Sequence, residues 1–124
     1  METPALHTPL TIIVVEDNPV DIYMIRWVLR AHELSYNLEV IENGDHAMHY
    51  IHHLADQERR RSPTIMLLDL NLPQLDGIEI LRHVKANPFG SEIHVVIVTS
   101  SKNSADQQET LALGADAYFV KPAG

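Results

Sequence analysis

Five short apolar segments, separated by stretches with helical periodicity, constrain the fold of this 124-residue chain more than any other feature. Their largely continuous apolar character is typical of strands covered on both faces in a parallel sheet. We expect these strands over 10–15, 38–41, 64–68, 93–98 and 117–120. The spacing of apolar residues predicts helices over 20–33, 46–60, 75–87 and 103–113. The alternation predicts an α/β fold, a parallel sheet with right-handed crossovers and helices on both faces.

Composition limits the domain organisation and the function classes. Residues 1–9 contain two prolines and no periodic pattern, so we expect a flexible segment there and one domain over 10–124. The chain has no cysteine, which excludes disulfides and thiolate metal sites, and its formal charge of −8 disfavours direct nucleic-acid binding. No apolar run approaches the ~20 residues of a membrane span, and no signal peptide is recognisable. We therefore expect a cytoplasmic protein that does not span a membrane.

The fourth predicted helix differs from the other three because it is mostly polar. Its few apolar anchors are Ala105, Leu111 and Ala112. We expect this helix to be held weakly against the core, because helix stability in proteins comes mainly from packing of an apolar face.

Polar residues follow four of the predicted strands at the point where each strand ends. Glu16 and Asp17 follow the first, Asp69 the third, Thr99 ends the fourth and Lys121 follows the fifth. Ligands of open parallel sheets bind beyond the carboxyl ends of the strands, so we expect these side chains to meet there. Three converging carboxylates repel one another unless positive charge lies between them. Lys121 supplies one such charge, and the all-oxygen donor set favours Mg²⁺ for the rest.

These residue types are the parts needed to accept a phosphoryl group: a nucleophile, charge neutralisation and a hydroxyl donor. Asp69 is the nucleophile we select, because it stands alone at the end of a buried strand. Glu16 and Asp17 are adjacent to each other and are better placed as metal ligands or as holders of metal-bound water.

The motifs Glu16-Asp17, Asp69–Gly77, Thr99-Ser100 and Lys121-Pro122 together resemble the receiver domain of two-component response regulators, over residues 10–122. The resemblance implies a flavodoxin-like, doubly wound sheet in the order 2-1-3-4-5. It implies that Asp69 is the phosphoacceptor. For the metal, the resemblance implies that Asp17, Asp69 and the Asn71 carbonyl bind Mg²⁺ and that Glu16 binds it through water. For the phosphoryl group, it implies contacts from Thr99 and Lys121. It also implies that Tyr118 changes position on phosphorylation and that the Lys121–Pro122 bond is cis.

By the same resemblance, the chain takes a phosphoryl group from a sensor histidine kinase and changes conformation to relay a signal. It catalyses only its own phosphorylation and dephosphorylation, so it is not classed as an enzyme. Within the family, Glu16–Asp21, Asp69–Pro73 and Ser100-Ser101 look most like the single-domain regulators associated with phytochromes. A phytochrome kinase is therefore one candidate partner.

The chain departs from the family pattern at its end, because no sequence for a fifth helix follows Lys121-Pro122. Without that helix, we expect an apolar strip beside the first helix to be open. Either a longer chain was cut here or a partner surface fills the gap, and a homodimer is one such arrangement. We expect self-association or low stability.

Two other function classes are open. A phosphatase or phosphotransferase of the haloacid dehalogenase type also uses a strand-end aspartate and Mg²⁺, but it places a second aspartate where this chain has Asn71. A receiver that acts only as a phosphorylation-independent binding module is disfavoured, since every residue of the acceptor site is present.

Three histidines lie close together in the second predicted helix, and we expect His46, His49 and His53 to face solvent. We expect Asp76 to form the turn into the third helix.

Overall fold

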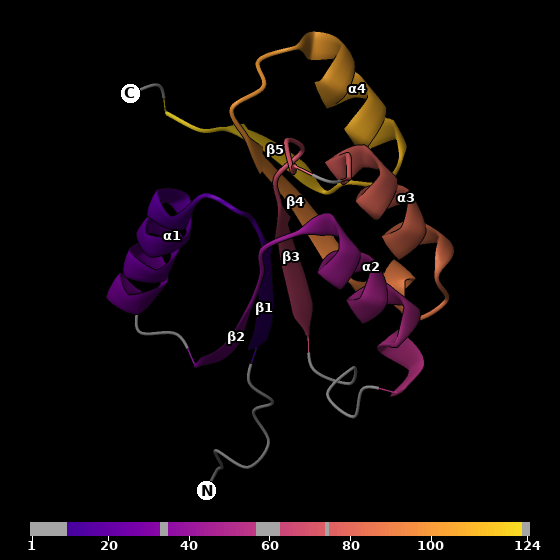
Figure 1. The fold of residues 1–124 in the computed structure, drawn as a ribbon, viewed down its shortest axis with the longest axis horizontal. Helices are drawn as coiled ribbons and strands as arrows, with labels where there is room; N and C mark the ends of the chain where they lie inside the picture. Colours follow the sequence, from indigo (N-terminus) through magenta and orange to yellow (C-terminus); the bar gives the residue numbers. More distant parts are fainter. Residues whose placement is uncertain (1–9, 33–34, 57–62, 74, 123–124) are drawn as a thin grey trace, which may run out of the picture.

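The computed structural model describes residues 10–32, 35–56, 63–73 and 75–122. Within them, five parallel strands form one sheet in the order β2-β1-β3-β4-β5, as Figure 1 shows. The predicted α/β fold and strand order are therefore confirmed. The strands are β1 (Leu10–Val15), β2 (Tyr36–Ile41), β3 (Thr64–Leu68), β4 (His94–Thr99) and β5 (Ala117–Val120). The helices are α1 (Pro19–Ala31), α2 (Gly44–His52), α3 (Gly77–Ala86) and α4 (Ser104–Ala112), with 3₁₀ turns η2 (Leu54–Asp56) and η4 (Gly90–Glu92).

Every one of the four α-helices begins at a side chain that accepts a hydrogen bond from a backbone N–H two or three residues later. The capping residues are Asn18, Asn43, Asp76 and Asn103. Such caps satisfy donors that the first turn of a helix leaves unpaired. The turn role predicted for Asp76 is thus confirmed.

The predicted second helix is too long and begins too late. In the structure α2 begins at Gly44 and ends at His52, and the chain then tightens into η2. The helix begins earlier than predicted because Asn43 caps its N-terminus. Residues 57–60 of the prediction lie outside the described residues, as do 1–9 and Glu33. His46, His49 and His53 are exposed, as expected.

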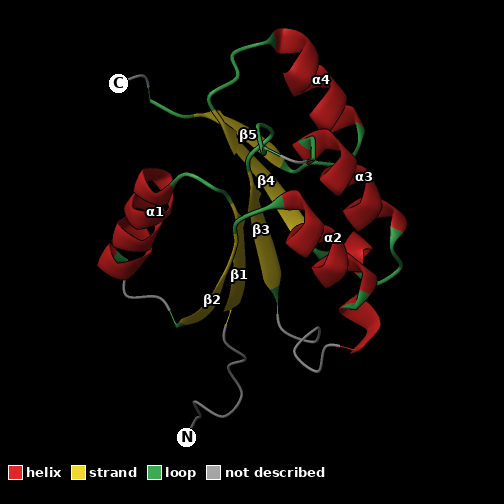
Figure 2. Ribbon diagram, viewed as in Figure 1, coloured by secondary structure: helices red, strands yellow, loops and turns green. Residues whose placement is uncertain are grey.

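The two faces of the sheet are covered unequally, with α1 alone on one face and α2, α3 and α4 on the other (Figure 2). The main core lies between the sheet and the second group. Its fully buried members include Ile13, Met66, Leu68, Ile80, Leu81 and Val84. By contrast, α1 has no buried residue. None of the helices in the described part of the chain has the length and apolar composition needed to cross a bilayer.

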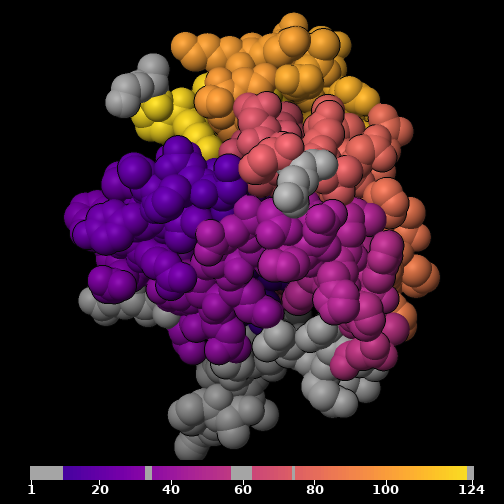
Figure 3. All heavy atoms as spheres, viewed as in Figure 1, coloured from indigo at the N-terminus to yellow at the C-terminus, as the bar shows by residue number. Residues whose placement is uncertain are grey.

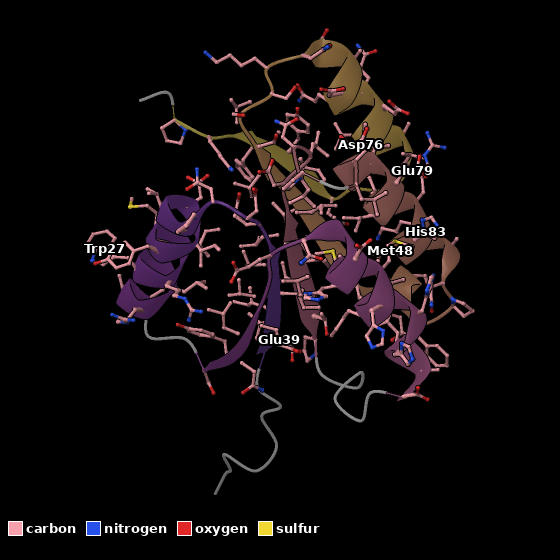
Figure 4. The ribbon with its side chains drawn as sticks, viewed as in Figure 1. Trp27, Glu39, Met48, Asp76, Glu79 and His83 are labelled. Atoms are coloured by element: carbon pink, nitrogen blue, oxygen red, sulfur yellow. The ribbon has the colours of Figure 1, made fainter. Side chains whose placement is uncertain are left out.

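The face of the sheet next to α1 is open, as the sequence predicts. A groove of about 580 Å³ runs between α1 and the sheet, with Met24, Val28, Leu67 and Val98 in its lining. Trp27 is 58% exposed and projects away from the sheet in Figure 4. Of the nine large apolar residues that are exposed in the described part of the chain, seven lie on α1 or β5: Val20, Tyr23, Met24, Trp27, Val28, Phe119 and Val120.

The anchors predicted for α4 are wrong. Ala105, Leu111 and Ala112 are all exposed, and the buried residue of this helix is Thr110. A polar residue can be buried here because its hydroxyl donates to the Asp106 carbonyl, at 2.9 Å, within the helix. Towards α3, Arg82 pairs with Glu109 at 2.9 Å, but both side chains are about half exposed. Little apolar surface therefore holds α4, consistent with the weak attachment expected for it.

The cis bond implied for Lys121–Pro122 is also wrong in this structure, where that peptide is trans. The trans form is favoured by about 0.5–1 kcal/mol for a bond before proline unless packing enforces the other isomer.

Gly77 places the start of α3 directly against the backbone that carries Asp69. A Cβ added at Gly77 would collide with the Asp69 carbonyl oxygen and would lie 2.7 Å from the Cα of Leu70. We expect Gly77→Ala to lower the free energy of unfolding by about 2 kcal/mol, because backbone atoms cannot move aside as a flexible side chain can. Chemical denaturation measures this.

The matched control is Glu79→Ala, which removes an exposed side chain from the same helix. It should change stability by less than about 0.5 kcal/mol. A Gly77→Ala protein as stable as this control would contradict the close packing described.

Candidate functional site

The carboxyl ends of β1, β3 and β5 bring oppositely charged side chains to one edge of the sheet. Carboxylate oxygens of Glu16, Asp17 and Asp69 all lie within 4.8 Å of one another. The Lys121 ammonium lies 2.7 Å from Glu16 Oε1 and 3.1 Å from Asp69 Oδ2. Lys121 also lies 2.7 Å from Asp21 Oδ2, in the first turn of α1. One ammonium group thus binds three carboxylates from three parts of the chain.

Lys121 and Glu16 are held in an environment of low solvent exposure. The exposed fractions of their side chains are 13% and 3%. Burial by itself lowers the pKa of Lys121, but the hydrogen bonds to Asp21, Glu16 and Asp69 outweigh it and raise that pKa above its usual value. Burial raises the pKa of Glu16, and the hydrogen bonds from Lys121 and Asn18 oppose this only in part. The lysine is therefore firmly cationic, and Glu16 depends on it as a counter-charge.

Asp69 is positioned by the backbone on both sides of it. Its N–H donates to the Val15 carbonyl at 3.1 Å, which continues the sheet pairing of β3 with β1. Its Oδ1 atom accepts from the Asn71 N–H at 3.1 Å, while Oδ2 faces Lys121. The residue is buried, so its two carboxylate oxygens are directed to fixed partners at the end of the strand.

Asn71 links the loop after β3 to the end of β4. Its amide nitrogen donates to Thr99 Oγ1 at 3.3 Å and to Ser100 Oγ at 3.4 Å. The Ser101 N–H also donates to Thr99 Oγ1, at 3.3 Å. In both of these hydrogen bonds the hydroxyl oxygen of the buried Thr99 is the acceptor. The hydroxyl proton of Thr99 therefore remains available for donation to another group.

Tyr118 contacts the loop that follows Thr99 at the end of β4. It is half-buried on β5, and its hydroxyl donates to the Ser101 carbonyl at 3.0 Å. Ser101 in turn donates from Oγ to Asp106 of α4 at 2.7 Å. A chain of hydrogen bonds therefore joins β5, the loop after β4 and the first turn of α4.

The donor set fits a hard divalent cation. The cavity at the site has a volume of about 350 Å³, and its lining includes Glu16, Asp17, Asp69 and Asn71. All of these offer oxygen ligands, and three carboxylates on Lys121 with a fourth, Asp17, beside Glu16 and Asp69 leave the site with an excess of negative charge. Oxygen ligands and uncompensated carboxylates are what Mg²⁺, Mn²⁺ or Ca²⁺ requires.

Six of the seven residues predicted from the sequence lie at this edge of the sheet, and the seventh, Tyr118, lies within β5. Glu16, Asp17, Asp69 and Lys121 form one cluster, while Thr99 and Asn71 form a second pair beside it and Tyr118 is joined through Ser101. These are the positions of the residues, and their chemical roles stay predictions.

Asp21 was missed by sequence reasoning, although it contacts Lys121 as closely as Glu16 does. One signal was available, because Pro19 begins a helix immediately after Asp17. The first turn of that helix therefore has to lie near the strand end.

Comparison with known proteins agrees with this geometry. The family model described as "Response regulator receiver domain" matches residues 12–124. The response regulator Rcp1 of Synechocystis is 34% identical over 115 residues, which cover 93% of this chain and 78% of that protein.

Solved structures agree in fold. The phosphorylated cyanobacterial phytochrome response regulator RcpA has a TM-score of 0.82 at 32% identity, covering 94% of this chain and 84% of that one. The receiver domain of the Pseudomonas aeruginosa sensor kinase PA1611, solved with magnesium in its active-site cleft, has a TM-score of 0.71 at 25% identity, covering 94% and 88%. The five-stranded fold, the acidic strand-end cluster and these matches lead to one conclusion: the chain belongs to the response regulator receiver domain family.

Proposed function

We propose that this receiver accepts a phosphoryl group on Asp69 from a sensor histidine kinase, and that phosphorylation changes the loop after β4. The observation that carries the proposal is the position of Asp69, buried at the end of β3 with the Lys121 ammonium at 3.1 Å and two further carboxylates within 4.8 Å. Nucleophile and charge neutralisation therefore lie together at one strand edge.

In the proposed reaction, a carboxylate oxygen of Asp69 attacks the phosphorus of a kinase phosphohistidine. The new O–P bond forms as the P–N bond breaks, and the imidazole nitrogen keeps the bonding electron pair. Lys121 then pairs with a phosphoryl oxygen, and Thr99 donates its hydroxyl proton to another. Glu16, Asp17, Asp69 and the Asn71 carbonyl would hold Mg²⁺, which neutralises charge on the transferred group when bound.

The conformational change would be transmitted through the hydrogen bonds that connect Thr99 to the loop after β4. When Thr99 turns toward the phosphoryl group, Ser101 is displaced with it. Ser101 is joined to Tyr118 and to Asp106, so the displacement reaches β5 and α4. Because α4 buries little surface, its position can be biased by a small free-energy change.

The names of relatives support a phytochrome-type kinase as the partner. RcpA is a cyanobacterial phytochrome response regulator, and the solved relatives RtBRR and AtBRR are bacteriophytochrome response regulators. We propose the same class of partner here. The cytoplasmic location and the lack of direct nucleic-acid binding stay predictions.

The first test uses acetyl phosphate and Mg²⁺ as a phosphodonor system. We expect one phosphoryl group per chain, carried on Asp69, labile to hydroxylamine and absent in Asp69→Asn, as measured by intact-protein mass spectrometry. Sustained release of phosphate over many turnovers would instead support the haloacid dehalogenase-like alternative. Absence of any adduct would support the binding-only module.

The second test addresses the metal. Saturation with Mg²⁺ at a hundred times its Kd should stabilise the folded protein by about 2.7 kcal/mol, because the ion binds the folded state alone. Thermal denaturation should show this gain in the wild type and lose it in Asp17→Asn. Asp45→Asn, which removes an exposed carboxylate from the first turn of α2, should keep the gain. Equal stabilisation of all three proteins would place the ion elsewhere.

The third test addresses the open apolar face on α1 and β5. We propose that two copies associate through this face, because the two elements that border it, α1 and β5, carry seven of the nine exposed large apolar residues in the described part of the chain. Val28→Glu should raise the dimer Kd by about tenfold or more, since a buried valine contributes about 1.5 kcal/mol. Light scattering after size exclusion measures the mass. Phe89→Glu alters an exposed apolar residue away from this face and should leave the mass unchanged, whereas a monomeric wild type would refute the proposal.

A further inference from the structure

We infer that Asp21 is a positioning residue for phosphoryl transfer, which competes with the phosphoryl group for the Lys121 ammonium. The inference rests on the proposed function, and it adds a residue that lies outside the predicted acceptor site. Asp21 belongs to α1, whereas the acceptor and its lysine follow strands.

The hydrogen-bonding capacity of Lys121 is fully used in the structure. An ammonium group has three protons to donate. Lys121 Nζ has three carboxylate acceptors, with the contacts to Glu16 and Asp21 at 2.7 Å and the contact to Asp69 longer, at 3.1 Å. Phosphorylation of Asp69 passes its share of Lys121 to the phosphoryl group, and a second hydrogen bond from Lys121 to that group requires Glu16 or Asp21 to give up its own.

Glu16 is poorly suited to give up its contact. Its side chain is 3% exposed, and its other oxygen already accepts from the Asn18 N–H at 3.2 Å. The loss of Lys121 would leave Glu16 as a buried carboxylate that faces Asp69. Separating it from its partner is costly, because water cannot replace the lysine there.

Asp21 is suited to give up its contact. Its side chain is 29% exposed, so water can solvate the carboxylate once Lys121 leaves. It also lies in the first turn of α1, where the helix N-terminus favours a negative charge. Of the two carboxylates that remain beside Lys121 once Asp69 is phosphorylated, Asp21 is therefore the one that Lys121 releases to make a second hydrogen bond to the phosphoryl group.

The same contact links the acceptor site to the open groove. Asp21 and Lys121 line both the acidic cavity and the apolar groove beside α1. Figure 3 shows the yellow atoms after β5 beside the indigo atoms of α1. Release of Asp21 thus removes a hydrogen bond between α1 and the end of β5 in the phosphorylated state.

The test measures binding of beryllofluoride, a phosphoryl analogue, in the presence of Mg²⁺ by isothermal titration calorimetry. Asp21→Asn should bind beryllofluoride about fivefold more tightly than the wild type, which is the scale of one partly exposed ion pair. Asp45→Asn is the matched control, because it removes one exposed carboxylate from the first turn of the next helix. It should change the affinity by less than twofold.

A double-mutant cycle separates competition for Lys121 from a general charge effect. In a Lys121→Met background, Asp21→Asn should have no more effect than Asp45→Asn. An equal effect of Asp21→Asn in both backgrounds, or no effect in either, would overturn the inference.

If Lys121→Met does not fold, a crystal structure of the beryllofluoride-bound wild type decides the question. Lys121 Nζ should then have left Asp21 Oδ2, and an unchanged contact would overturn the inference. Failure of the proposed function looks different: the wild type would bind beryllofluoride no better than Asp69→Asn does, and both ideas would fall together. Asp69-dependent binding that is unaffected by Asp21→Asn would remove only the inference.

Discussion

A single, partly buried ammonium group holds together the carboxylates at the carboxyl ends of the strands. Lys121 reaches carboxylates that are 105, 100 and 52 positions away in the sequence. Each carboxylate alone would be unfavourable in a site of low exposure, and the three together repel one another. The lysine makes the arrangement stable while leaving it short of positive charge. In the proposed function, that shortage is the physical reason why a divalent cation would bind together with the anionic phosphoryl group.

The sheet divides the molecule into a rigid side and a loosely covered side. Between the sheet and α2 and α3, aliphatic side chains are fully buried. On the other side, α1 contributes no buried residue and is joined to the end of β5 by the Asp21–Lys121 contact. The acceptor site sits where the two sides meet, at the carboxyl end of the strands. A rigid scaffold thus fixes Asp69, while the elements around it, α1 and α4, are held by few apolar contacts.

Much of the fold and of the site could be predicted from local patterns. Continuous apolar runs identified all five strands, and helical periodicity identified the four α-helices, although the third was expected to begin at residue 75 and begins at Gly77. Errors arose where tertiary contacts decide the outcome. The alanines and leucine expected to anchor α4 are exposed, because Thr110 satisfies its own hydroxyl within the helix and can take the buried position. The boundaries of α2 differed because a cap at Asn43 and a tightened turn at Leu54 outweigh periodicity.

The sequence by itself determined the order of strands and helices and the polar residues at the ends of four strands, because both depend on neighbours along the chain. It also determined the excess of acidic groups at the strand ends. Only the tertiary structure decided which carboxylates bind Lys121, since those hydrogen bonds join residues that the crossovers bring together. Asp21 shows the difference: in the sequence it is one acid in a helical turn, and in the fold it is as close to the lysine as Glu16.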